Sequence, residues 1–263
     1  MDHLTLPLAI AFLFFVGAMG GWVLEFFYRN LISHKGPRGK FFINPGFCKG
    51  PWLPIYGIGL SVMCVLSEVV YSYIDPAIAN TVPATILIIL IMGLTMNVIE
   101  FLGGVILLKF FNMRLWDYRD RPGNIMGVVC PLFALIWTGI SAVYYLFIHE
   151  ISLENLAWFS KNLAYAFFVG LFFGLFIVDM AGAFSDAKLI KRFANDREVI
   201  VKYEDLKALI QQRRLASNKK QSFFSRVISK GSELEANLEA CLAAMEDKKE
   251  SLKAKFGRVK HSR

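Results

Sequence analysis

Hydrophobic residues in this chain gather in five long blocks separated by short polar stretches. The blocks cover about 4–28, 51–74, 83–108, 124–148 and 162–184. Each approaches or exceeds the ~20 residues that a helix needs to cross a ~30 Å hydrocarbon core. A soluble helix shows a polar face at every turn, and stretches such as Ile86–Gly93 and Tyr165–Val178 have none. The pattern therefore predicts an all-α membrane bundle of five transmembrane helices.

Composition supports a membrane location. Of the 263 residues, 56% are hydrophobic and 14% are aromatic, and the mean hydropathy is +0.47, above ordinary soluble domains. The first block follows Asp2 and His3 rather than a basic segment, and no small-residue cleavage site ends it. Such a block is typical of a retained transmembrane helix and not of a secretory signal peptide.

Basic residues are distributed unevenly among the connecting segments. The first and third loops carry Arg29, Lys35, Arg38, Lys40, Lys49, Lys109, Arg114, Arg119 and Arg121. The segment before the first block and the second loop carry none, and the fourth loop has only Lys161. Since Lys and Arg accumulate in cytoplasmic loops, we expect a multi-pass protein of the cell (inner) membrane. Its N-terminus is expected outside and its C-terminus in the cytoplasm.

Charge divides the chain at about residue 184. Residues 1–184 contain 10 basic and 10 acidic residues, whereas 185–263 contain 19 and 11, which gives the whole net charge of +8. We therefore predict a transmembrane bundle over 1–184 and a basic cytoplasmic tail over 185–263. Such a tail favours contact with anionic lipid of the inner leaflet. Nucleic acid is not an expected partner, because no signature of a nucleic-acid-binding fold accompanies the charge.

The tail has a helical pattern. Charged and apolar residues alternate at helical spacing over 185–217, and 221–232 forms a short break. A stripe with the spacing of a short coiled coil follows, formed by Leu234, Leu238, Cys241, Met245 and Leu252. Because the stripe is only about three heptads long, we expect a helical hairpin or a partner-docking helix rather than a long zipper.

Two parts of the bundle share local identity. The first block contains WVLEFF (22–27) and the third contains NVIEFL (97–102), and the blocks that follow begin near NPGFCKGP (44–51) and NIMGVVCP (124–131). Acidic residues inside spans are rare, so the aligned glutamates carry most of the weight. The match predicts a parallel repeat of helix pairs 1–2 and 3–4, with helix 5 appended.

Four carboxylates lie within the predicted spans: Glu25, Glu68, Glu100 and Asp179. An acidic residue at mid-bilayer costs about 2.5–3.5 kcal/mol on insertion scales, so each of them needs a partner or a role. At the rise of an α-helix, Glu25 lies roughly 6 Å, Asp179 roughly 10 Å and Glu100 roughly 13 Å from the cytoplasmic edge. Glu68 lies roughly 25 Å along its helix and therefore near the outer face.

Small residues share the helix faces of these carboxylates. They recur at spacings of three and four: Gly17 and Gly21 before Glu25, Gly57, Ser61 and Cys64 before Glu68, Gly93, Asn97 and Gly104 around Glu100, and Gly170 with Gly174 on the fifth helix. Small residues let helices approach closely, so the carboxylates are expected to face the bundle interior. There they either hold helices together by hydrogen bonds or line a polar cavity as a substrate or proton site.

The stretch NPGFCKGPWLPIYGIG, 44–59, precedes the second block and is rich in Gly and Pro. Irregular backbone at membrane depth is tolerated only where it lines a cavity or is buried in protein. Two structures fit: a tight turn before a proline-initiated helix, or a loop that turns back into the membrane and binds a polar ligand. The hinge positions are Gly46, Gly50, Pro51, Pro54 and Gly57, and the ligand groups are Asn44, Lys49 and Tyr56.

The stretch RLWDYRDRPGN, 114–124, precedes the fourth block. Its aromatic residues and arginines fit a membrane interface, whereas Asp117 and Asn124 have no purely interfacial role. Pro122 and Gly127 are the hinge positions expected here. The candidate substrate-binding residues are therefore Glu25, Asn44, Lys49, Tyr56, Asn97, Glu100, Asp117 and Asn124.

The chain offers little for metal or redox chemistry. Its cysteines, Cys48, Cys64, Cys130 and Cys241, fall in cytoplasmic or intramembrane positions, where no disulfide framework is expected. No Cys-x-x-Cys occurs and the four histidines are scattered, so we expect no metal site and no cofactor.

Several of these stretches together resemble a family of small bacterial membrane proteins, the CmpB-like putative ABC-transporter type IV permeases. The resemblance rests on GWVLEFFYR in the first block, on 44–59, on Glu100 and on LWDYRDRPGNIMG (115–127), and it covers roughly 15–140. Where the family has Arg between Asn and Gly before the second helix, this chain has Pro45. The resemblance implies a permease. Because the chain contains no G-x-x-x-x-G-K-[ST] loop, an ATPase would be a separate cytosolic subunit.

Three functions fit these features. A permease component for a small polar substrate would use the inner-half carboxylates and the irregular loops, and it needs a homo-oligomer or a partner membrane subunit because five helices form at most half a pathway. A membrane-embedded enzyme would use Glu25 and Glu100 as acid and base on a lipid-linked substrate. No Ser–His pair, Cys–His pair or metal cluster favours that reading. A scaffold or regulator would recruit a partner through the tail. The sequence favours the permease over an enzyme.

Overall fold

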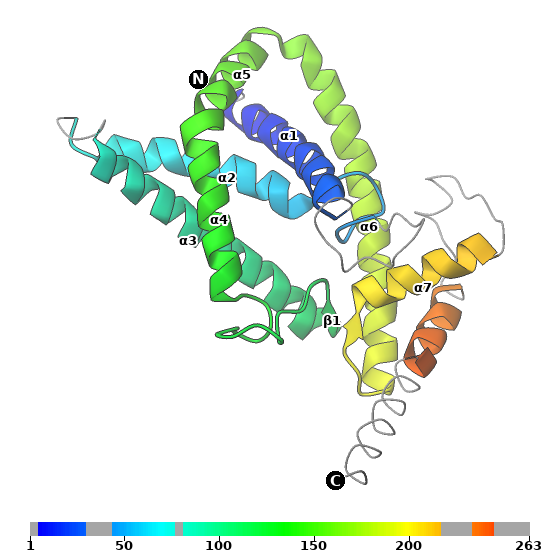
Figure 1. Ribbon diagram of the computed structural model, residues 1–263. Coiled ribbons are helices and arrows are strands. Elements are labelled where there is room, and N and C mark those ends of the chain that lie inside the picture. The colour runs from blue at the N-terminus through cyan, green and yellow to red at the C-terminus, as the bar shows by residue number, and fades with distance from the viewer. Residues whose placement is uncertain (1–4, 30–43, 77–80, 217–232, 245–263) are drawn as a thin grey trace.

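The computed structural model describes residues 5–29, 44–76, 81–216 and 233–244, and Figure 1 shows the course of the chain. The described part is almost entirely helical: α1 (Thr5–Phe27), α2 (Pro54–Tyr73), α3 (Val82–Phe111), α4 (Pro131–Val143), α5 (His149–Lys161), α6 (Ala166–Asp196), α7 (Tyr203–Ala216) and an unlabelled helix over 233–244. A π-helical turn η2 (Tyr144–Ile148) joins α4 to α5, and a 3₁₀ turn η3 (Leu163–Tyr165) precedes α6. Prolines stand in the first turns of α2, α3 and α4, where a missing N–H costs nothing.

Five stretches are long and apolar enough to cross a membrane: Leu6–Phe27, Pro54–Tyr73, Val82–Phe111, Pro131–Lys161 and Leu163–Asp196. The predicted all-α membrane bundle with five spans is confirmed. We call the end of the bundle that carries residues 44–53 and 112–130 the loop end. The far end is the opposite one, where the chain passes from α2 to α3.

The fourth span differs from its predicted bounds of 124–148. Helix α4 begins at Pro131, and the helical course continues through η2 and α5 to Lys161. Residues 124–130 are apolar enough to extend the block, but Met126 and Gly127 have φ of 55° and 68°. A helix cannot pass through left-handed residues, so this segment folds as a loop. Residues 149–161, predicted as a connection, are instead helical.

Helix α6 continues past residue 184 and ends at Asp196. The continuous tail helix predicted over 185–217 is wrong at this point, because Glu198 has a φ of 52° and a strand follows. Strand β2 (Val201–Lys202) pairs in parallel with β1 (Met113–Arg114), and α7 begins directly after it. The run Val199–Ile200–Val201 is β-branched and favours extended backbone over helix.

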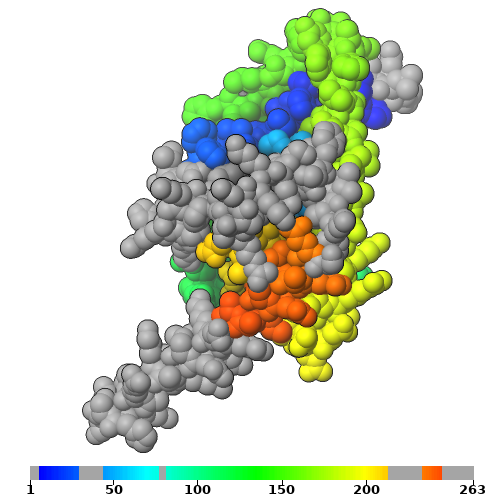
Figure 2. Space-filling model, turned by 90° about the vertical axis from the view of Figure 1, so that its right-hand side faces the viewer, coloured from blue at the N-terminus to red at the C-terminus, as the bar shows by residue number. Residues whose placement is uncertain are grey.

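Two apolar cores hold the fold together. The first lies between α1, α2, α3 and α4 and includes Met63, Ile88, Met92 and Met96. The second lies at the loop end, where α6, α7 and helix 233–244 meet residues of the 44–53 loop. Figure 2 shows helix 233–244 packed beside the end of α6 and α7 on one face of the molecule.

The tail helix uses part of its predicted stripe for this second core. Leu234, Leu238 and Cys241 are buried there. Met245 and Leu252 lie outside the described residues, as does the predicted break over 221–232. The described part of the stripe therefore packs within the chain itself.

Candidate functional site

The loop at 44–53 is folded around the side chain of Asn44. Its Nδ2 donates to the carbonyl oxygens of Cys48 at 3.2 Å, Lys49 at 2.8 Å and Gly50 at 3.1 Å. Its Oδ1 accepts the indole N–H of Trp22 at 2.5 Å, which attaches the loop to α1. A single amide thus satisfies three carbonyl groups of irregular backbone, which would otherwise be costly to bury.

Asp179 of α6 holds the same loop from the other side. It is fully buried, and its carboxylate accepts the backbone N–H groups of Lys49 at 3.1 Å and Gly50 at 2.8 Å, and the indole N–H of Trp52 at 2.9 Å. The Lys49 ammonium forms an ion pair with Asp186 at 2.7 Å. Three donors surround the buried carboxylate, so Asp179 anchors the loop to α6.

Helix α7 uses further carbonyls of the loop. The Lys207 ammonium donates to the carbonyl oxygens of Asn44 at 2.8 Å and Gly46 at 2.9 Å, and the Tyr203 hydroxyl donates to that of Phe47 at 3.3 Å. Burial of the ammonium group, with Arg29 nearby, lowers the pKa of Lys207 to about 7. Asn44 and Lys49, predicted as ligand groups of this loop, thus make their polar contacts within the chain.

Glu25 lies at the loop end of α1, where it joins α2 to α7. Its carboxylate accepts hydrogen bonds from the Arg29 guanidinium at 2.7 Å and from the Tyr56 hydroxyl at 3.3 Å. Arg29 in turn forms an ion pair with Glu204 of α7 at 2.8 Å. The side chains of Glu25, Arg29 and Glu204 are 20%, 33% and 49% exposed, so this chain of charges runs from a largely buried carboxylate to the surface.

Glu100 of α3 lies in a different environment. It is 4% exposed, and its two oxygens accept the Tyr118 hydroxyl and the Trp137 indole N–H, each at 3.0 Å. Within the described residues it forms no ion pair. The Trp137 ring lies 5.8 Å from that of Tyr56, centroid to centroid, so Tyr56 links the surroundings of Glu25 and Glu100.

Close helix contact brings these groups together. A Cβ atom at Gly21 of α1 would overlap the Tyr56 ring, and one at Gly57 of α2 would collide with Phe14. The predicted small-residue contact between these two helices is therefore present. A Cβ at Gly170 or Gly174 would meet no heavy atom within 4 Å, so this pair, expected to bring helices together, makes no such contact with the described residues.

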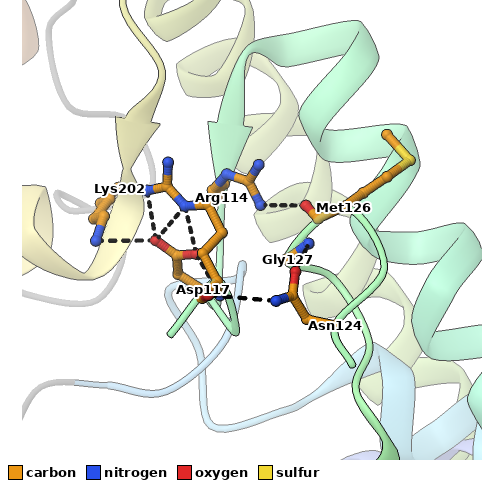
Figure 3. A network of polar contacts seen from close by, with 7 residues as sticks. Arg114, Asp117, Asn124, Met126, Gly127 and Lys202 are labelled. Atoms are coloured by element: carbon orange, nitrogen blue, oxygen red, sulfur yellow. Dashed lines mark hydrogen bonds and ion pairs between the residues drawn. The ribbon is translucent and has the colours of Figure 1, made fainter. Parts of the chain in front are cut away.

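The loop at 112–130 is held by its own polar residues and by Lys202 of β2 (Figure 3). Asp117 accepts the Arg119 guanidinium at 2.7 Å and the Lys202 ammonium of β2 at 2.9 Å. These contacts, that of Arg119 above all, keep the pKa of Asp117 well below its usual range. Asn124 accepts the backbone N–H of Gly127 at 3.0 Å and donates to the Arg121 carbonyl at 2.8 Å. Both residues thus shape the loop, and Asp117 also ties it to β2 of the tail.

The structure places the predicted site residues in three groups. Glu25 contacts Tyr56 in the bundle at the loop end, and Glu100 is linked to them through the Trp137 ring. Asn44 and Lys49 belong to the adjacent loop, with the hinge positions Gly46, Gly50 and Pro51, while Pro54 and Gly57 begin α2. Asp117 and Asn124 lie in the 112–130 loop with Pro122 and Gly127. Asn97 stands apart from the three groups, because its amide donates to the Gly93 carbonyl of its own helix at 2.7 Å.

Two partners of Glu100 were not predicted as site residues. Tyr118 was assigned to the membrane interface, and Trp137 was not singled out. Burial and the neighbouring Glu100 carboxylate raise the pKa of Tyr118, which keeps its hydroxyl a donor. A buried Tyr or Trp needs an acceptor for its polar hydrogen, and an acid inside a span needs donors. This match between an intramembrane acceptor and aromatic donors is the sequence signal that could have identified Tyr118 and Trp137 as partners of Glu100.

Comparison with known proteins gives one result. The family model described as "putative ABC-transporter type IV" (CmpB) matches residues 12–184, about two thirds of the chain and all of the residues around Glu25 and Glu100. No curated protein and no solved structure gives a significant match. With five membrane-spanning helices and a family match over most of its length, this chain belongs to the putative ABC-transporter type IV family.

Proposed function

We propose that this chain is the membrane component of a permease for a small polar solute, with Glu25, Tyr56 and Glu100 as its binding site. The environment of Glu100 carries the proposal. Its carboxylate is buried at membrane depth, and the described residues supply it with two neutral donors. An intramembrane carboxylate without a counter-charge is costly, and a bound cation removes that cost. A solute with an ammonium or guanidinium group would supply the charge.

The elements around Glu100 give the solute a route. Tyr118 comes from the loop before α4, and Tyr56 stands in the first turn of α2, directly after the 44–53 loop. Both irregular loops therefore border the proposed site at one end of the bundle. If either loop moves, the donors to Glu100 or Glu25 move with it, and the carboxylate is freed for the solute.

The tail is connected to this site by charge. Arg29 lies between Glu25 and Glu204 of α7, and Lys207 of α7 holds the 44–53 loop. A force on α7 would therefore reach both the carboxylate and the loop. This arrangement supports a separate cytosolic ATPase that drives transport by acting on α7, in keeping with the family. The chain would assemble with a second copy of itself or with a partner membrane subunit.

The proposed orientation follows from charge. The loop end, rich in Lys and Arg, faces the cytoplasm of a cell (inner) membrane. The tail then also lies in the cytoplasm, where its basic residues favour anionic lipid.

Solute-driven current in proteoliposomes tests the permease. Methylammonium, choline, guanidinium and lysine are offered in turn, with ATP present, to the protein purified together with the subunits that mild detergent retains from native membranes, on a solid-supported membrane. We expect a saturable current with at least one of them, lost in Glu100→Gln and kept in Glu154→Gln, an exposed acid of α5. Saturable current that persists unchanged in Glu100→Gln would remove Glu100 from the site, and no current with any solute would count against this substrate class.

A scaffold remains the second candidate, because α7 and helix 233–244 form a folded unit with the end of α6. Affinity purification from native membranes separates the two functions. We expect an ATPase at near-stoichiometric yield, released when the chain is cut after Asp196, where α6 ends. Recovery of a different cytosolic protein that the same truncation releases, together with absent current, would favour the scaffold.

A further inference from the structure

A second buried polar cluster lies at the far end of the bundle, away from Glu100. There α2 and α5 bring an acid and an imidazole together, with Glu68 Oε1 at 2.9 Å from His149 Nε2. The Glu68 side chain is 54% exposed and that of His149 is 7% exposed. The contact therefore joins a carboxylate at the protein surface to a base in the interior.

The backbone around His149 is unusual. Residues Tyr144–Ile148 form the π-helical turn η2, closed by the N–H of His149 on the carbonyl of Tyr144. Such turns are rare and concentrate at functional sites. Here the Tyr144 hydroxyl lies 3.2 Å from His149 Nδ1, and the Tyr145 ring stacks on the imidazole with centroids 5.5 Å apart. Both ring nitrogens of His149 thus have a hydrogen-bonding partner.

We propose that Glu68 and His149 form a proton-binding site of the transport cycle, loaded from the far end of the bundle. This inference rests on the proposed permease function for its purpose, but the binding of the proton can be measured without any solute.

The exchange of the proton follows from the geometry. Before proton uptake, Nδ1–H donates to the Tyr144 oxygen and Nε2 is unprotonated, so the ionised Glu68 carboxylate has no donor there and turns toward solvent. A proton taken up by this exposed carboxylate forms an O–H···Nε2 hydrogen bond and then passes to Nε2 of His149. Glu68 then returns to a carboxylate and His149 becomes an imidazolium, so that one proton has moved and one charge has been gained by the pair. In that state Nε2–H donates to Glu68 and Nδ1–H donates to the oxygen of Tyr144, and each N–H of the cation has an acceptor.

The surroundings do not oppose the added charge. The titratable groups near the pair come from the elements that pack around it. They are one further carboxylate, Glu150 of α5, and thiol or phenol groups that are uncharged when protonated: Cys64 and Tyr71 of α2, and Tyr144 and Tyr145 of η2. Helix α1 also packs against α5 and presents Phe12 to Phe159 there, and the titratable residues in its described part lie at its loop end. No described cation opposes protonation of His149 at this site.

One buried face of a continuous helix leads from this pair to Glu100. Trp137, Ser141, Tyr144 and His149 are all buried on α4, η2 and α5. Ser141 donates to the carbonyl of Trp137 at 2.9 Å, and Trp137 donates to Glu100 at 3.0 Å. Twelve residues of helix span roughly 18 Å, so a shift of this helix on proton binding would move the Trp137 donor against Glu100.

A hydrolase triad is the other reading of these residues, because Ser67 also touches His149. Its Oγ lies 3.3 Å from Nδ1 and 3.4 Å from Nε2, so it points at neither nitrogen in particular. The same hydroxyl donates to the carbonyl of Cys64 at 2.9 Å and is 1% exposed. A nucleophile needs its proton directed at the base and its oxygen open to substrate, and Ser67 has neither.

The test is a titration of His149 in the full chain, with the proton as the probe. The protein, labelled with ¹⁵N-histidine, is placed in lipid nanodiscs, and His149→Gln assigns its imidazole signal among the four histidines. The imidazole signal is followed from pH 5 to 9, and we expect the proton to bind at least roughly tenfold more weakly in Glu68→Gln than in the wild-type protein, because an adjacent carboxylate stabilises the imidazolium. Glu154→Gln is the matched control and should leave the midpoint unchanged.

A second readout addresses the transport cycle. Solute-driven current is recorded with equal pH on both sides, at pH 6 and pH 8. We expect at least a threefold difference in the wild-type protein and none in Glu68→Gln. If Glu68→Gln does not yield folded protein, Tyr144→Phe removes the Nδ1 partner alone and should also move the His149 midpoint.

The outcomes separate the two proposals. An imidazole that keeps one protonation state from pH 5 to 9, or a midpoint that Glu68→Gln does not move, overturns the proton site whatever the current shows. A titration as expected with a current that does not depend on pH overturns its place in the cycle. Absence of any current in the wild-type protein would instead count against the proposed solute class of the permease, and the titration alone would then decide whether the proton site exists.

Discussion

Replacement of Asp179 tests how the 44–53 loop is held. In Asp179→Ala, the backbone N–H groups of Lys49 and Gly50 and the Trp52 indole lose their acceptor at a buried position. A hydrogen bond to a charged group contributes about 1.5–3 kcal/mol net. The Lys49 hydrogen bond is the longest of the three, and the freed donors regain hydrogen bonds to water when the loop opens. We therefore expect the free energy of loop opening to fall by about 4 kcal/mol, below the sum of three such bonds.

Cys48 reports that opening directly. It is 2% exposed, and burial together with the nearby Asp179 carboxylate raises the pKa of its thiol to about 12. In a protein whose other three cysteines are replaced by serine, maleimide labels Cys48 through local opening of the loop. A change of about 4 kcal/mol then accelerates labelling roughly a thousandfold.

Loss of the Asp179 charge also makes the thiolate easier to form, so a second variant is needed. Asp179→Asn removes the charge but keeps one oxygen that accepts a hydrogen bond, and its labelling should lie between wild type and Asp179→Ala. Asp186→Asn, which weakens only the Lys49–Asp186 ion pair, whose side chains are 18% and 20% exposed, should change the rate less than about fivefold. Equal rates in both Asp179 variants would assign the effect to charge alone, and rates within tenfold of wild type would refute the anchoring role.

Three further predictions use thermal unfolding followed by tryptophan fluorescence. Between pH 7 and about 10 the unfolded chain binds more protons at Lys207 than the folded chain does, so the wild-type Tm should rise with pH across this window, and the rise should flatten in Lys207→Met. Gly21→Ala should destabilise the protein by about 1–3 kcal/mol because its Cβ overlaps Tyr56, while the matched Gly174→Ala should not. Tyr118→Phe should cost about 1–3 kcal/mol, since Glu100 then loses a donor; an unchanged Tm would mean that the hydroxyl has no such role.

Much of the architecture is readable from local sequence, since apolar length decides whether a helix can span a membrane. Errors arise where backbone conformation overrides hydrophobicity. The apolar residues before Pro131 extend the fourth block in the sequence, but left-handed Met126 and Gly127 make them a loop. The tail helix breaks at Glu198 for a similar reason, and the pairing of β2 with a strand about ninety residues earlier has no local signal.

The candidate site is only partly readable in the same way. An acidic residue within a predicted span needs hydrogen-bonding partners, so Glu25 and Glu100 can be identified from the sequence. Their partners cannot, because they come from distant segments. Periodicity places Asp179 on a helix face without revealing that it meets the 44–53 loop. Ser67 and His149 illustrate the same limit: they are 82 residues apart, and their contact arises only from packing of α2 against α5.

We propose that the helix pairs α1–α2 and α3–α4 are a parallel repeat, as the sequence predicts, because each pair contains the same kind of hydrogen bond. Glu25 of α1 accepts a hydrogen bond from Tyr56 near the start of α2, and Glu100 of α3 accepts one from Trp137 in the second turn of α4. In both pairs a carboxylate of the first helix meets an aromatic donor of the second.

The anchoring of the 44–53 loop has a consequence for biogenesis. Lys49 and Gly50 are synthesised about 130 residues before their acceptor Asp179, and Asn44 precedes Lys207 by 163. At 5–20 residues per second, this leaves the loop without those partners for on the order of 10 s during translation. The first helix hairpin therefore enters the bilayer early but is completed late, when α6 and α7 emerge from the ribosome.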